Sequence, residues 1–137
     1  MGTTNYTDTF IAVAETSDAT TGEVPPRSTS GPTIAELEYE LLSTHPYEYT
    51  SDQLLFEVHA LRAGIPAEQR EQERADFFSR SQACLRSSPL SKRYGWGTHH
   101  DAEGRVALVA VDSPEYAAFA ADESLKQTRA MASSRRH

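Results

Sequence analysis

The segment from Lys92 to Asp101 gathers more groups capable of chemistry than any other stretch of this chain. It combines two bases, two aromatic rings, two glycines, two histidines and one acid, in the order Lys92-Arg93-Tyr94-Gly95-Trp96-Gly97-Thr98-His99-His100-Asp101. Imidazoles carry protons or bind metals near neutral pH, and cations beside aromatic rings can hold an anion or a flat ring. This segment is therefore the first place in which we expect a binding site.

An extended backbone sends every second side chain to the same face of a sheet. If this segment is extended, Tyr94 and Trp96 share one face, whereas His99 and Asp101 share a face that His100 does not. Glycines between the aromatic residues allow a ligand or a packed helix to approach the backbone closely. The pattern predicts a β-hairpin that presents aromatic and polar groups to a partly wet surface.

A stretch with four bases and no acid, from Arg80 to Arg93, leads into this hairpin. Such a stretch can orient an anion. Our leading hypothesis is a cytoplasmic, non-catalytic domain that binds a small anionic or aromatic ligand, or a protein partner, at the hairpin face of residues 86–101. The expected ligand-binding residues are Arg86, Lys92, Arg93, Tyr94, Trp96 and His99.

A small metal-assisted enzyme is the alternative hypothesis. His99 and Asp101, together with His45 or His59, offer ligands that zinc or iron accepts. The chain holds no compact ligand motif such as His-Glu-x-x-His, no phosphate-binding Gly-rich loop and no Ser-centred elbow. We therefore expect no bound metal and no cofactor, and we leave open whether the protein is an enzyme.

Cys84 is the single cysteine, so the chain cannot form an internal disulfide, which fits a reducing cytoplasm. The first residues lack the basic and apolar segments of a secretion signal, and no apolar run reaches the roughly 18 residues of a membrane span. We therefore expect a cytoplasmic protein without a membrane partner. The thiol is either a nucleophile activated by Arg80 and Arg86 or a small buried apolar group.

The formal net charge of −7 is unevenly distributed. Residues 1–60 hold ten acids and one base, whereas residues 61–137 hold ten acids and twelve bases. The acidic balance disfavours binding to nucleic acid or to an anionic membrane. A homodimer in which the acidic half of one copy meets the basic half of the other is a further hypothesis.

Two regions carry strand patterns. Residues 9–14 form a short apolar run that we expect to be central in a sheet, because both of its faces are apolar. Residues 93–111 predict the hairpin, with its turn at Asp101-Ala102-Glu103-Gly104. Between residues 16 and 32 the Ser, Thr, Gly and Pro content predicts a long loop.

Helix signals fill much of the remaining chain. Two capping boxes predict helices from Thr33 to about Thr44 and from Thr50 to Gly64. Pro66 begins a third expected helix, which continues to about Ser79 and is pinned to the surface at its far end by two phenylalanines. These helices supply the apolar faces that a sheet needs for its core.

The last part of the chain predicts two more helices. Ser113 caps one of them, and Asp122 or Ser124 begins a short one that holds Leu125 and Met131. Residues 133–137 are expected to form a frayed tail. The whole pattern predicts a single α+β domain over residues 1–137, with a small, mostly antiparallel sheet covered by helices on one face.

Several blocks of sequence resemble an uncharacterised family of small, mostly microbial proteins, the domain of unknown function 6157. The blocks are Thr4-Asn5-Tyr6 with Asp8-Thr9-Phe10-Ile11-Ala12-Val13-Ala14-Glu15, Thr50-Ser51-Asp52 through Leu55-Phe56-Glu57-Val58-His59-Ala60, Cys84-Leu85-Arg86-Ser87-Ser88-Pro89-Leu90 with Lys92-Arg93-Tyr94-Gly95-Trp96-Gly97, and Leu125-Lys126-Gln127. The resemblance spans nearly the whole chain and implies a single domain. It assigns no activity and no site residue.

Overall fold

Four strands pair into one sheet, in the order β3-β2-β1-β4, in the computed structural model, which describes residues 3–132. Their bounds are Thr9–Ala12 (β1), Trp96–His100 (β2), Val106–Ala110 (β3) and Lys126–Arg129 (β4). β2 is antiparallel to both of its neighbours, and β4 is parallel to β1. The sheet is therefore mixed, although most of its pairing is antiparallel as the sequence predicts.

The β2–β3 hairpin lies where the sequence predicts it. Its turn is held by Asp101, whose Oδ1 accepts hydrogen bonds from the backbone N–H groups of Glu103 and Arg105. Gly104 has a φ of 82°, a left-handed conformation that glycine adopts without a steric penalty. An Asp and a Gly at these positions therefore fix the turn locally.

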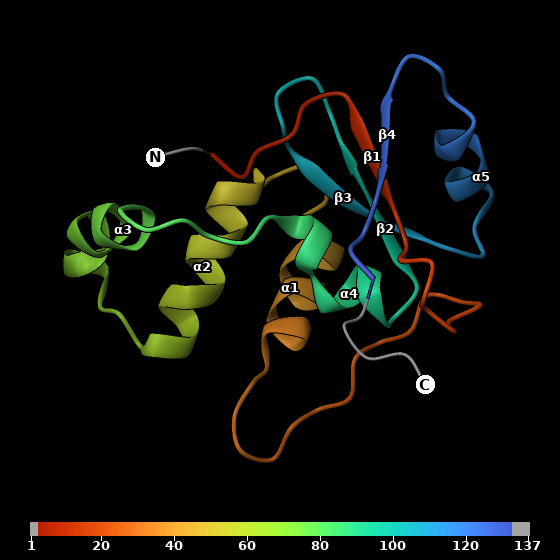
Figure 1. The fold of residues 1–137 in the computed structure, drawn as a ribbon. Helices are drawn as coiled ribbons and strands as arrows, with labels where there is room; N and C mark the ends of the chain where they lie inside the picture. Colours follow the sequence, from red (N-terminus) through yellow and green to blue (C-terminus); the bar gives the residue numbers. More distant parts are fainter. Residues whose placement is uncertain (1–2, 133–137) are drawn as a thin grey trace.

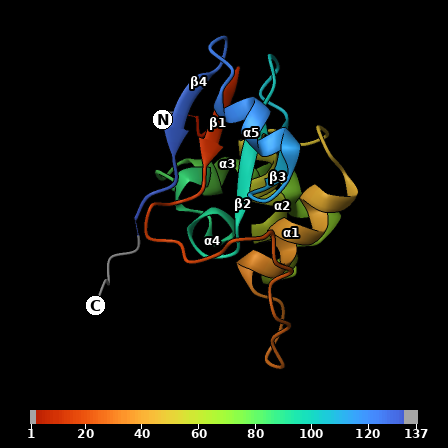
Figure 2. The same cartoon turned by 90° about the vertical axis from the view of Figure 1, so that its right-hand side faces the viewer.

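Five α-helices lie on the two sides of this sheet in the described part of the chain (Figures 1 and 2). Their bounds are Ile34–Thr44 (α1), Ser51–Ala63 (α2), Arg70–Phe78 (α3), Pro89–Lys92 (α4) and Pro114–Ala120 (α5). α1, α2 and α4 lie on one side, with α3 outside α2, whereas α5 covers the other side. The expectation that helices cover a single face is wrong.

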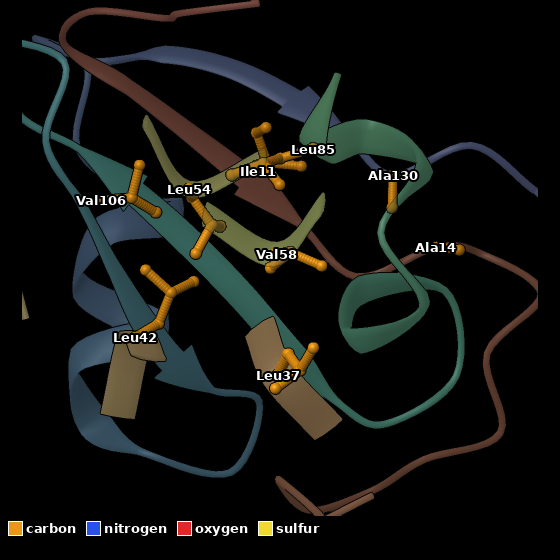
Figure 3. Packing of buried hydrophobic residues seen from close by; sticks show 9 residues of the cluster. All are labelled: Ile11, Ala14, Leu37, Leu42, Leu54, Val58, Leu85, Val106 and Ala130. Carbon is orange, nitrogen blue, oxygen red and sulfur yellow. The ribbon is translucent and has the colours of Figure 1, made fainter. Parts of the chain in front are cut away.

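β1 shows why both faces are covered. Phe10 packs against Tyr116 and Phe119 of α5, with ring centroids 5.0 Å and 5.9 Å apart. The next residue, Ile11, points the other way and joins the core cluster beneath α1 and α2 (Figure 3). Both side chains have no exposed surface. The prediction of a central strand with two apolar faces is confirmed.

The core on the α1–α2 side joins the sheet, the helices and the segment before α4 (Figure 3). Its buried members are Ile11, Ala14, Leu37, Leu42, Leu54, Val58, Leu85, Val106 and Ala130. Both predicted capping boxes are present, with the side chains of Thr33 and Thr50 as N-caps. The helices therefore begin at the residues that the sequence indicates.

The short helix expected after Asp122 is wrong, because this segment forms β4. The backbone N–H of Lys126 donates to the carbonyl of Asp8, and that of Ala130 donates to the carbonyl of Ala12. A single turn of helix is marginal in isolation, so the open edge of β1 decides the conformation. The expected frayed tail, residues 133–137, lies outside the described residues.

Residues 16–32 form the long loop that the sequence predicts, without a helix or a strand in that span. The loop is attached to the hairpin, because the backbone N–H of Glu23 donates to the carbonyl of Tyr94. After residue 32 the chain continues directly into α1. Across residues 3–132, no helix has the length and the apolar character that crossing a membrane requires.

Candidate functional site

The aromatic residues predicted to form one site lie on opposite faces of the sheet. The Trp96 ring lies 5.6 Å from Tyr39 of α1, and its Nε1 donates to the carbonyl of Glu23 at 2.8 Å. His99 instead stacks on Phe119 of α5, with ring centroids 4.1 Å apart. An odd and an even position on one strand cannot share a face, which explains the separation.

The predicted basic residues are also dispersed. Arg86 donates from Nε to the carbonyl of Arg129 at 2.7 Å, which ties it to β4. Lys92 ends α4, and Arg93 follows it as an exposed C-cap residue. Tyr94 precedes β2. The structure therefore does not bring the six expected residues to one surface, and a ligand contact by any one of them stays a prediction.

His99 forms a small cluster of its own on the α5 side. Its Nδ1 lies 2.8 Å from the hydroxyl of Tyr47, in the loop between α1 and α2. Burial lowers the pKa of His99, against the opposing charges of Asp101, Asp122 and Asp8. Tyr47 has a φ of 61°, an uncommon value for a residue with a side chain.

The metal-assisted alternative has no ligand set in the described residues. Residues 3–132 contain no group of three His, Cys, Asp or Glu side chains placed to hold a metal ion. His45 packs edge-on against Tyr49, and His59 stacks on Phe77 with centroids 4.6 Å apart. These histidines therefore belong to different aromatic clusters from His99.

A pocket of about 680 Å³ lies between α1 and α2 and is bordered by α3 and residues 82–89. These elements lie together on one side of the sheet in Figure 1. Much of the wall is apolar, with contributions from Ile34, Leu55, Val58, Leu61, Phe77 and Pro89. Pockets of this size and character typically hold small molecules, with a few polar groups that fix their orientation.

Glu38 is the buried acid in this wall. It is 2% exposed, and it shares the buried side of α1 with Ala35 and Leu42. Burial raises its pKa to about 7, although the hydrogen bond from Ser88 acts in the opposite direction. The Ser88 hydroxyl donates to Oε1 at 2.6 Å. Burial against apolar surface therefore favours the neutral form of the Glu38 carboxyl group and raises its pKa.

Other polar groups of the pocket are already engaged with the protein. The Sγ of Cys84 lies 3.1 Å from the hydroxyl of Tyr6, whose pKa rises to about 12 chiefly because of burial. Gln82 donates to the carbonyl of Phe77, and Arg62 donates from Nε to the carbonyl of Pro32 at 3.4 Å. Cys84 is half-buried, so its sequence-based interpretation as a buried apolar group holds only in part.

Glu38 is not among the site residues predicted from the sequence, although the sequence contains a signal for it. Its spacing from Ala35 and Leu42 is three and four residues, which places all three on one side of a helix. Two neighbouring acids of α1, Glu36 and Glu40, made this stretch resemble a solvated acidic surface. The apolar spacing, rather than the acidic composition, identifies the buried carboxyl group.

The fold and the pocket define a single-domain α+β protein with a ligand-sized hollow beside a buried acid. The chain matches the family described as "Family of unknown function (DUF6157)" over residues 1–136, and it belongs to that family. Comparison with curated proteins and with solved structures gives no match. The resemblance seen in the sequence is confirmed.

Proposed function

We propose that this protein binds a small molecule in the pocket between α1 and α2. The observation that carries this proposal is Glu38, a buried carboxyl group in the wall of a largely apolar hollow of about 680 Å³. Burial of an acid costs free energy unless a partner compensates it. A ligand with an apolar body and one polar group supplies such a partner.

The mouth of the pocket supports the same function. Ile34 and Leu61 both line the pocket, and they are 42% and 45% exposed. Large apolar side chains that are exposed together at a hollow are typical of binding sites. A ligand that fills the pocket would cover them. The sequence predicted a ligand at the hairpin face of residues 86–101, whereas we propose a ligand in the pocket between α1 and α2.

Blocking the mouth tests the proposal. Ala63 lines the pocket and is exposed at the end of α2, so Ala63→Trp places a large ring at the mouth without disturbing the core. Ala118→Trp, at an exposed position of α5, is the matched control. We expect thermal shifts with a library of small apolar amines, alcohols and acids in the wild type and in Ala118→Trp, and their loss in Ala63→Trp.

Two results would contradict this function. One is a wild-type melting temperature that no compound raises at millimolar concentration, because a ligand that binds only the native state must stabilise it. The other is an equal response of wild type and Ala63→Trp, which would place the bound compound elsewhere. A response that disappears in Ala118→Trp instead would assign binding to the α5 side.

A cytoplasmic location and a homodimer also remain proposals. The single cysteine supports a reducing compartment, and the uneven charge of the two halves supports association of two copies. Cell fractionation tests the location. Light scattering at low and high salt tests the dimer, which should dissociate at high salt if charge holds it together.

A further inference from the structure

We propose that the ligand is a monoamine with an apolar body, and that its ammonium group binds the carboxyl group of Glu38. This inference rests on the proposed function, because it names the chemical class of the ligand for the same pocket. It depends on three features of the pocket wall as residues 3–132 form it: the buried position of Glu38, the lack of a basic partner for Glu38 and the location of Arg62.

Glu38 has an acceptor available for a ligand. Among residues 3–132, Ser88 is the one residue that donates a hydrogen bond to the carboxyl group of Glu38, through Oε1. A carboxylate accepts several hydrogen bonds, and an ammonium group donates three. Hydrogen bonds between charged partners are shorter and stronger than neutral ones, especially where water is excluded. An ammonium group therefore compensates the burial of Glu38 better than an alcohol does.

Within residues 3–132, Glu38 forms no ion pair with a basic side chain. Arg62 is the one Arg or Lys of residues 3–132 that lines the pocket, and it is exposed and donates to the carbonyl of Pro32. Arg70 lies outside this wall and pairs with Glu57 at 2.7 Å. A buried carboxyl group is stabilised either by protonation or by a positive partner, and a bound ammonium group would supply that partner.

Arg62 also restricts the other end of the ligand. A second ammonium group near the mouth would lie close to this guanidinium group, and like charges repel at short range. The apolar wall formed by Leu55, Val58 and Phe77 requires hydrocarbon between the two ends. A monoamine on an alkyl or aralkyl body meets both conditions, whereas a polyamine does not.

Proton release distinguishes this ligand class from neutral ones. Burial raises the pKa of Glu38 to about 7, so part of the population is protonated at pH 6.5, and an arriving ammonium group favours ionisation. The other titratable groups of the wall are His59 on α2 and Cys84 before α4, and neither is hydrogen-bonded to Glu38. Amine binding should therefore release protons, and alcohol binding should release none.

The test uses three matched compounds, 2-phenylethylamine, 2-phenylethanol and phenylacetate. We expect wild type to bind the amine at least about tenfold more tightly than the alcohol, and to bind phenylacetate least. Glu38→Gln keeps an oxygen that can accept from Ser88 but removes the charge, so amine and alcohol should bind it within about twofold of each other. Glu40→Gln, an exposed change on the same helix, should behave as wild type.

Calorimetry at pH 6.5 in two buffers of different ionisation enthalpy supplies a readout on the wild type alone. The apparent binding enthalpy of the amine should depend on the buffer, and that of the alcohol should not. Equal affinity for amine and alcohol, blocked by Ala63→Trp, would overturn the amine inference and leave the proposed function standing. Binding of none of the small molecules in the test or the library would overturn both.

Discussion

The hydroxyl of Ser88 connects the N-terminus of α4 to the buried carboxyl group of Glu38. It donates to Oε1 of Glu38 at 2.6 Å and accepts from the backbone N–H of Leu90 at 3.1 Å. One side chain thus caps a helix and satisfies part of a buried acid, although 50 residues separate the two partners in sequence. Pocket geometry and helix capping therefore depend on the same atom.

Removal of this hydroxyl should destabilise the protein more than removal of an ordinary N-cap. Ser88→Ala leaves the backbone N–H of Leu90 uncapped and a buried carboxyl oxygen unpaired, at an expected cost of about 2–4 kcal/mol. Thr33→Ala removes the exposed capping box of α1 and should cost about 1 kcal/mol. Urea unfolding at pH 7.5 compares the two, and equal losses would contradict the shared role of Ser88.

Glu38 should make the native state more stable as the pH falls. Its native pKa of about 7 lies above the ordinary value of 4.5, so between these values the native state binds more protons than the unfolded state. The contribution grows from pH 8 to pH 4 and reaches about 3 kcal/mol. The difference in unfolding free energy between wild type and Glu38→Gln should change by this amount over that range. A pH-independent difference would contradict the elevated pKa.

His100 should have the opposite effect. It has no exposed surface, and its Nδ1 has no hydrogen-bond partner in the described part of the chain. Burial, assisted by the charge of His99, lowers its pKa from 6.5 to about 4. The unfolded state therefore takes up a proton first, and stability falls by about 3 kcal/mol as the pH drops from 6.5 to 4.

The variant His100→Phe isolates this contribution. A phenyl ring keeps the packing against Tyr6, whose ring centroid lies 5.4 Å away, and it cannot be protonated. Unfolding of this variant should lack the acid-side loss that wild type shows. An NMR titration should also show an imidazole that stays neutral to about pH 4. A signal that titrates at the ordinary pKa would contradict burial of His100.

Two glycines with the same backbone handedness should respond very differently to alanine. Gly95 and Gly64 have φ values of 81° and 67°. A methyl group on Gly95 would collide with the backbone carbonyl of Thr21, whereas nothing lies within 4 Å of one on Gly64. Gly64→Ala should cost about 1 kcal/mol from backbone strain alone.

Gly95→Ala should cost at least about 3 kcal/mol, because the collision adds to the strain. The loop of residues 16–32 should then detach from the hairpin and become sensitive to protease, while Gly64→Ala keeps the loop protected. Similar unfolding free energies and similar cleavage rates for the two variants would contradict the close approach of Thr21 to Gly95.

The sequence was sufficient to predict those helices and strands whose own residues indicate their structure. Thr33 and Thr50 show their capping boxes in the sequence, and the apolar run at residues 9–14 shows a strand with two covered faces. β4 has no such signal, because residues 126–129 are polar and become a strand only through the hydrogen bonds of β1. The strand propensity of a segment depends on its own residues and does not reflect a pairing partner that lies so far away in sequence.

The pocket was harder to predict from the sequence than the fold. Its wall combines residues from four separate segments, so no single motif represents it. We predicted a site at the hairpin because its chemical groups lie close together in the chain. On a strand, however, successive side chains point to opposite faces, so Trp96 and His99 are separated. Glu38 and Ser88 meet only after α1 and α4 have packed.

The parallel pairing of β1 with β4 imposes an order on biosynthesis. Residues 9–12 leave the ribosome before residues 126–129, with which they pair, and the segments of β2 and β3 emerge between them. Until then an apolar strand keeps an open edge, the feature by which unfinished chains stick to one another. Completion of the sheet therefore waits for a contact between segments more than 100 residues apart, the kind of long-range pairing that slows folding.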